Sequence, residues 1–160
     1  MSIKTAEERF WAKVNKTATC WLWEGATLNS GHGQFNSGRM EGRNVLVLVH
    51  RYSYALSFGP IPAGVFLDHK CHVKNCVHPD HLRPATNKQN MENRTGPTVL
   101  SKSGVRGVYW HTQRQKWVAT VGHNGKSIYA GIFTDQHEAE LAARAKRDEL
   151  FSHNLEGQIQ

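Results

Sequence analysis

A cluster of histidines and cysteines at residues 68–82, which reads DHKCHVKNCVHPDHL, is the part of the chain best suited to chemistry. Hydrolysis of a phosphodiester needs a base that activates water and a cation that neutralises the charge developing on the phosphate. His69 is the predicted base, and Asp68 and His81 are predicted to hold one divalent ion from the two sides of a β-hairpin and a helix. Carboxylate and imidazole ligands suit several ions, and we expect Mg²⁺ or Mn²⁺ as the cofactor.

The three cysteines indicate a second metal site. Cys71 and Cys76 flank the loop of the cluster, and Cys20 lies in a segment that should pack beside it. An odd number of cysteines argues against a disulfide framework, whereas a structural zinc needs four ligands. Spacing does not decide which histidine completes the set: His72, His78 or His81. His78 is the candidate taken forward, and buried thiols without a metal are the alternative.

The elements that must position these residues alternate between short helices and strands. Helical patterns occur at residues 5–14, 50–58, 79–82, 87–93 and 135–150. Aromatic and β-branched runs predict strands within residues 20–35 and 44–49, and at 64–68, 107–111, 117–123 and 126–133. Asn124-Gly125 predicts a tight hairpin turn between the last two strands. The fold class that we expect is α+β.

Composition restricts the partners. The chain has 160 residues and a formal net charge of +7, which favours a polyanionic partner such as nucleic acid. No apolar run approaches the roughly 18 residues needed to cross a bilayer, and the first residues lack the apolar core of a secretory signal. We therefore expect a soluble cytoplasmic protein with no membrane partner.

The cluster also resembles a known family. The pattern DHKC-x4-C-x2-PDHL, followed by NKQNMEN, resembles the ββα-metal (His-Me) finger of HNH endonucleases, in particular the phage and homing type. Three earlier segments fit the same family, namely residues 20–23 (CWLW), 31–35 (GHGQF) and 50–54 (HRYSY). The resemblance extends over roughly residues 5–95.

The resemblance implies a role for each matching residue. His69 corresponds to the general base, Asp68 and His81 to the metal ligands, and Asn90 to a supporting residue on the closing helix. Many relatives have an asparagine where this chain has Cys76, and Asn75 stands just before it. Asn75 is therefore a candidate for orienting His69, and the identity of the orienting group stays open.

The C-terminal part is basic and aromatic. Between Lys102 and Thr134 there are five basic residues and no Asp or Glu. Residues 103–150 resemble the DNA-binding domain of the plant APETALA and ethylene-response factors, which implies a three-stranded antiparallel sheet packed on one helix. The residues implied to meet DNA are Arg106, Tyr109, His111, Arg114, Lys116, Trp117 and Lys126. Trp117 is equally suited to the core of such a sheet.

These observations predict a two-part nuclease. Residues 1–95 form the HNH nuclease domain, 96–104 a linker, 105–152 the DNA-binding domain and 153–160 a tail. Double-stranded DNA is the expected partner, and family resemblance implies products with 5′-phosphate and 3′-hydroxyl ends and a phage or mobile-element origin in a bacterial host. The alternative is a catalytically inactive, zinc-stabilised DNA-binding regulator. The sequence does not choose between a monomer and a homodimer.

Overall fold

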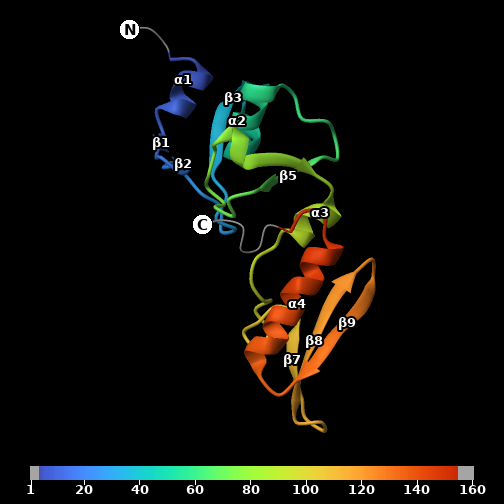
Figure 1. Ribbon diagram of the computed structural model, residues 1–160. Coiled ribbons are helices and arrows are strands. Elements are labelled where there is room, and N and C mark those ends of the chain that lie inside the picture. Colours follow the sequence, from blue (N-terminus) through green and yellow to red (C-terminus); the bar gives the residue numbers. More distant parts are fainter. Residues whose placement is uncertain (1–3, 155–160) are drawn as a thin grey trace. The chain divides into compact units, whose positions relative to one another are not determined.

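The computed structural model describes residues 4–154, and the chain divides into two compact units, residues 1–90 and 91–160 (Figure 1). Both units mix helices with small antiparallel sheets. Most of the expected tail, residues 155–160, lies outside the described residues. In the described part of the chain, none of the helices has the length and apolar character that crossing a membrane requires.

The first unit begins with helix α1, Ala6–Trp11. Thr5 caps it, because its side chain accepts from the backbone N–H of Glu8 while the Glu8 carboxylate accepts from the backbone N–H of Thr5. The sequence predicted a helix as far as residue 14, and this is wrong at its C-terminal end. The β-branched Val14 instead begins strand β1 (Val14–Lys16), which pairs with β2 (Trp21–Trp23).

A β-hairpin and a helix follow. Strand β3 (Gln34–Met40) pairs with β4 (Arg43–Leu48), with a bulge between Asn36 and Gly38. Helix α2 (Val49–Phe58) starts directly after β4 and ends at Gly59, whose φ of 88° suits glycine. These elements enclose a mainly aromatic core of Phe10, Trp23, Phe35, Val49 and Val77.

The histidine and cysteine cluster is placed by a second hairpin. Strand β5 (Phe66–His69) pairs with β6 (Leu82–Ala85), and helix α3 (Asn87–Glu92) follows. Residues 79–82 were expected to start a helix, but Pro79–His81 makes a single 3₁₀ turn (η1) and Leu82 already belongs to β6. The cluster therefore lies on the loop between two paired strands.

The second unit is built on a three-stranded antiparallel sheet. Its strands are β7 (Val108–His111), β8 (Lys116–His123) and β9 (Lys126–Phe133), in the order β7-β8-β9. Helix α4 (Gln136–Leu150) lies along one face of this sheet (Figure 1). The core between them is made of small side chains: Val108, Ala119, Ala139 and Ala143. Residues 96–104, expected as a linker, belong to this unit and contain no helix or strand.

Candidate metal centre and catalytic site

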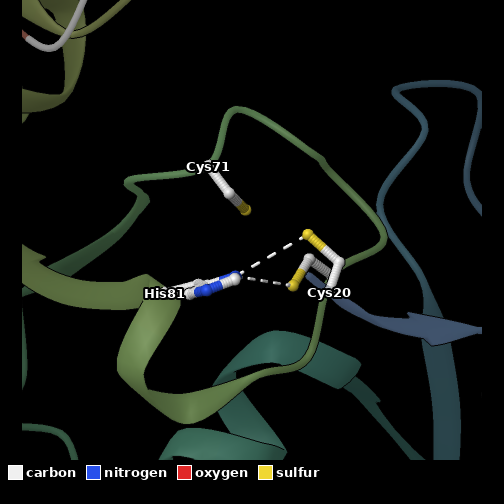
Figure 2. Close-up of side chains that lie close together, drawn as sticks. Cys20, Cys71 and His81 are labelled. Carbon is white, nitrogen blue, oxygen red and sulfur yellow. Dashed lines mark hydrogen bonds between the residues drawn. The ribbon is translucent and has the colours of Figure 1, made fainter. Parts of the chain in front are cut away.

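Four side chains from separate segments of the first unit meet in one place. Cys20, Cys71, Cys76 and His81 each offer one ligand atom, and these four atoms all lie within 4.8 Å of one another. Nδ1 of His81 is 3.7 Å from Sγ of Cys20 and 3.6 Å from Sγ of Cys76. Figure 2 shows Cys20, Cys71 and His81 pointing toward a common centre. The structure thus brings His81 to the cysteines.

Backbone pairing explains how Cys20 reaches a cluster some fifty residues further along the chain. Strand β2 forms an antiparallel bridge between Leu22 and Cys76. The backbone N–H of Val77 donates to the carbonyl of Trp21 at 2.7 Å, and that of Trp23 donates to the carbonyl of Asn75 at 3.0 Å. Cys20 directly precedes β2, so this pairing places its thiol beside that of Cys76.

The distances in this group fit a tetrahedral ion. Zinc binds thiolate sulfur at about 2.3 Å and imidazole nitrogen at about 2.0–2.1 Å, so a sulfur–nitrogen edge of the tetrahedron is about 3.6 Å. The two measured edges from His81 are 3.7 and 3.6 Å. Three sulfurs and one nitrogen are also a standard donor set for structural zinc. The cluster can therefore hold a metal such as zinc.

Electrostatics point the same way. The contact with the Cys71 thiol lowers the pKa of Cys76 to about 4, while the same contact raises the pKa of Cys71. Burial raises the pKa of Cys20. One thiolate is thus stable among the three sulfurs, and each further negative charge is disfavoured by burial and by the first. A divalent cation would remove this penalty, because it favours thiolate over thiol at every ligand.

His78, the fourth zinc ligand predicted from the sequence, lies behind the ligand set. Its ring stacks on that of His81, with centroids 4.5 Å apart and an interplanar angle of 17°, and it packs against Trp21 at an interplanar angle of 42°, with centroids 4.4 Å apart. Its Nδ1 accepts from the backbone N–H of Asp80, so the ring caps η1. The turn beginning at Pro79 then presents the side chain of His81 to the sulfurs. His78 therefore packs against His81, and His81 is the histidine that faces the sulfurs.

His69 and Asp68 lie at the end of strand β5, and both are buried. Nε2 of His69 is 3.1 Å from the carbonyl oxygen of Cys76, so Nε2 carries the proton and donates. The neutral ring then has its lone pair on Nδ1. Burial lowers the pKa of His69, which keeps the ring neutral near pH 7.

Asp68 pairs across the hairpin with Arg83, its neighbour in the β5–β6 register. Nε of Arg83 lies 2.9 Å and Nη2 lies 2.8 Å from the same carboxylate oxygen, Oδ2. Asp68 is thus paired with a guanidinium, whereas His81 faces two thiols.

The two asparagines expected at the site occupy different elements. Asn75 donates from Nδ2 to the carbonyl of Trp23 at 3.4 Å, which ties the cysteine loop to β2. Asn90 lies on helix α3 and is half-buried. The group found on Nε2 of His69 is the backbone carbonyl of Cys76, so a main-chain atom makes the contact for which Asn75 was a candidate.

Two further histidines surround His69. The ring of His50 lies 4.9 Å from that of His69, and the ring of His32 lies 6.0 Å from it. His50 is only 5% exposed, and within residues 4–154 its Nδ1 has no hydrogen-bond partner. Burial lowers the pKa of His50 to about 3, with smaller contributions from His69, His32 and Arg51.

The residues of the second unit that were expected to meet DNA lie at different positions and differ in exposure. Tyr109, His111 and Lys116 share one face, because Tyr109 lies opposite Val118 and His111 lies opposite Lys116, and side chains alternate along each strand. This face of the sheet points away from α4, which packs on the other face. Arg114 is exposed in the turn between β7 and β8, and Lys126 is exposed where β9 begins.

Two of these expected contacts are engaged inside the unit. The guanidinium of Arg106 donates to the carbonyls of Met91, Glu92 and Arg94. Trp117 is half-buried and packs against the small-residue core on the α4 side of the sheet. Trp117 therefore lies at the edge of the core, which was the alternative to a DNA contact. Arg106 binds the chain segment 91–94.

Sequence reasoning missed Arg83 and the two histidines near His69. The hairpin register could have revealed Arg83, because it stands opposite Asp68 once β6 is recognised. His50 begins the segment HRYSY, which was noted only as a family feature. Nothing in the local sequence around His32 indicates that its loop returns to His69.

The match to a known family lies almost entirely in the first unit, which ends at residue 90. Residues 47–92 match the model of a family described as HNH endonuclease. This stretch includes β5, η1 and β6, and it contains His50, Asp68, His69 and His81. It indicates a nuclease domain. Cys20 and the three-stranded sheet lie outside the matched residues.

Three proteins of Escherichia phage T7 are similar to the chain. Protein 7.7 is 33% identical over 73 residues, which are 46% of this chain and 52% of that protein. Protein 2.8 is 32% identical over 87 residues (52% and 55%), and Protein 3.8 is 37% identical over 68 residues (42% and 55%). The chain spans about half the length of these relatives. No solved structure matches it significantly.

The metal centre predicts a specific zinc content. Purified protein should contain about one zinc per chain, and Cys71→Ser or His81→Ala should reduce this to a small fraction, because a structural site needs all four ligands. His78→Ala should keep the zinc. Elemental analysis of the three variants checks this. A zinc content that depends on His78 and not on His81 would contradict the geometry.

The buried His50 predicts a loss of stability in acid. In the unfolded chain His50 takes up a proton near pH 6.5, and in the folded chain only near pH 3, so the unfolded state binds more protons between these values. The free energy of unfolding should therefore fall as the pH drops below 6.5, by up to about 1.4 kcal/mol per pH unit from this group.

Urea unfolding between pH 7 and pH 4 measures this slope. His50→Phe should flatten it, whereas the matched control His137→Phe, on the exposed surface of α4, should not. Loss of metal in acid is common to all three proteins and cancels in the comparison. If the free energy of unfolding falls equally steeply with decreasing pH in wild type and in His50→Phe, protonation of His50 is not the cause of the acid destabilisation.

Proposed function

We propose that the protein is a metal-dependent DNA endonuclease whose reaction takes place at β5, with the HNH finger formed by the β5–β6 hairpin and α3. The observation that carries the proposal is the state of His69. Its ring is buried and neutral, its Nε2 is engaged by the Cys76 carbonyl, and it lies next to a buried carboxylate within the stretch that matches the HNH endonuclease family.

His69 is the general base in this proposal. With Nε2 donating to a carbonyl, Nδ1 accepts a proton from a water molecule, and the water oxygen attacks the phosphorus as the bond to the leaving oxygen breaks. The hydrogen bond to Cys76 also stabilises the imidazolium that forms, because the carbonyl oxygen carries partial negative charge. By family resemblance, the products carry 5′-phosphate and 3′-hydroxyl ends.

Asp68 is the protein ligand proposed for the catalytic cation, with Asn90 as a supporting residue. A buried carboxylate suits Mg²⁺ or Mn²⁺, since such ions commonly use one or two carboxylates and complete their shell with water and substrate phosphate. The ion would neutralise charge on the phosphate. His81 was expected as a second ligand, but its Nδ1 faces Cys20 and Cys76, so we assign it to the structural centre.

Zinc at the four-ligand cluster has an indirect role in this proposal. Cys76 supplies a sulfur to the cluster, and its carbonyl oxygen is the atom that receives the Nε2 proton of His69. An ion that fixes the position of Cys76 therefore also fixes the orientation of the base. Structural zinc would support catalysis without contacting the substrate.

The second unit is proposed to hold duplex DNA. Support comes from the excess of basic residues over residues 102–134, from the sheet face opposite α4 that carries Tyr109, His111 and Lys116, and from the resemblance to the APETALA and ethylene-response-factor domain. Arg114 and Lys126 add exposed charge. Binding through this unit would raise the local concentration of the scissile bond near His69.

The similar proteins also support a proposal about where the protein acts. All three similar proteins belong to Escherichia phage T7, which infects a bacterium. We propose that this protein, too, is encoded by a phage or mobile element and acts on DNA in the cytoplasm of the host cell.

Plasmid nicking in the presence of Mg²⁺ or Mn²⁺ tests the proposed reaction. His69→Ala should reduce the rate by about 10²- to 10⁴-fold, the usual contribution of a general base. His137→Ala, which removes an exposed imidazole from α4, should cut at the wild-type rate. Both variants should keep their zinc.

The outcomes separate the two candidate functions. Equal cutting by wild type and His69→Ala would mean that the activity comes from another site or from a contaminant. A folded, zinc-loaded wild type that binds DNA and never cuts it would favour the zinc-stabilised regulator. The ion pair between Asp68 and Arg83 is the structural feature that agrees with that second candidate.

The role of the second unit is tested by salt. Lys116→Ala should weaken binding to duplex DNA about equally for all sequences, and should reduce the slope of log affinity against log salt by about 1. Lys146→Ala is the matched control, because Lys146 lies on α4 and pairs with Glu149 at 2.6 Å. Fluorescence anisotropy between 50 and 300 mM salt, roughly, measures both slopes. Equal slopes for the two variants would argue against this sheet face.

A further inference from the structure

The β3–β4 hairpin is a two-stranded ribbon with two chemically different faces. Phe35 and Val47 are paired neighbours on its inner face and pack in the aromatic core. Pairs alternate between faces along the ribbon, so the outer face is set by the register. It carries the pairs Gln34–Leu48, Asn36–Leu46 and Arg39–Asn44. The outer face thus combines amides, one guanidinium and leucines.

This outer face is accessible along much of its length. Leu46 is 57% exposed, and Arg39 and Asn44 are exposed as well. Between residues 34 and 48 the single acidic residue is Glu41, which lies in the turn and not on the outer face. The face is therefore positively charged and free of carboxylates.

The composition of the face matches the chemistry of base edges. Asn and Gln can pair bidentately with adenine, Arg can pair with the O6 and N7 atoms of guanine, and an apolar side chain can contact the methyl group of thymine. The major groove of B-DNA, about 12 Å wide, admits a two-stranded β-ribbon. Duplex DNA is a polyanion whose base edges can bind the amides, the guanidinium and the leucines of this face.

The cross-strand pair Arg39–Asn44 is already arranged for such a contact. Nε of Arg39 donates to Oδ1 of Asn44 at 3.3 Å. This bond uses Nε of the guanidinium and holds the Arg39 side chain against its cross-strand neighbour. Restricting a long, flexible side chain before binding reduces the entropy lost on contact.

We propose that the outer face of the β3–β4 ribbon enters the major groove of duplex DNA and reads base edges, with Arg39 and Asn44 as specificity-determining residues. The inference rests on the proposed function, because it concerns where the same substrate is read. It also assigns sequence preference to the first unit, whereas the sheet of the second unit would supply affinity.

Sequencing of the ends produced from randomised duplex DNA tests the proposal. Wild type should show a base preference, and Arg39→Ala should reduce discrimination at one or two adjacent positions by roughly 5- to 150-fold, the range for one bidentate contact. Asn44→Ala should alter the same or the neighbouring position. Arg43→Ala is the matched control: it removes the same charge, but Arg43 pairs with Met40 on the other face, so the preference should stay.

Several outcomes would overturn the proposal. These are a wild type that cuts without base preference, an unchanged preference in Arg39→Ala and Asn44→Ala, and an equal change in Arg43→Ala. Thermal unfolding establishes that each variant is folded. If Arg39→Ala does not fold, Asn44→Ala tests the proposal independently.

A second measurement separates this inference from the proposed function. If wild type cuts no DNA, the proposed function fails, and sequences bound by wild type and Arg39→Ala are then selected from the same randomised library. A difference in the selected bases supports reading by the ribbon without catalysis, and identical selected bases overturn it.

Discussion

The hydrogen bond between His69 and the main chain of Cys76 is the interaction on which the site depends. A histidine can remove a proton only if one ring nitrogen has a lone pair in the right place, and the partner of the other nitrogen decides which one that is. Here that partner belongs to a residue whose side chain is part of a metal-binding cluster. The geometry of His69, the proposed base, is therefore tied to a cluster of sulfurs through the loop between β5 and η1.

The position of His81 determines how many metal centres the finger can supply with its own histidines. An imidazole that points Nδ1 at two sulfurs cannot use the same atom for a second ion. In the proposed mechanism, a cation held by Asp68 would therefore rely on oxygen ligands from the protein, water and the substrate. Such a site would bind its ion weakly without DNA, which couples metal and substrate binding.

Much of this arrangement follows from the sequence, and the parts that do not have physical reasons. Strong local signals placed α2 and the strands of the second unit, because their apolar residues recur at the right period and Asn124-Gly125 makes the turn. Residue types and their order also indicated a metal site at the three cysteines, which the structure brings together with His81. Spacing could not show that His81, and not His78, faces the three cysteines, because this depends on the direction of one 3₁₀ turn and on packing against Trp21. The resemblance to the plant DNA-binding domain implied a DNA contact for Arg106, but its guanidinium donates to carbonyl groups 12 to 15 residues earlier in the chain.

The separation of the four ligands along the chain has a consequence for how the protein matures. Cys20 and His81 are 61 positions apart. During synthesis, the ribosome must release nearly all of the first unit before an ion can find its complete shell. A bound ion would close a long loop and remove many conformations from the unfolded chain, much as a cross-link would.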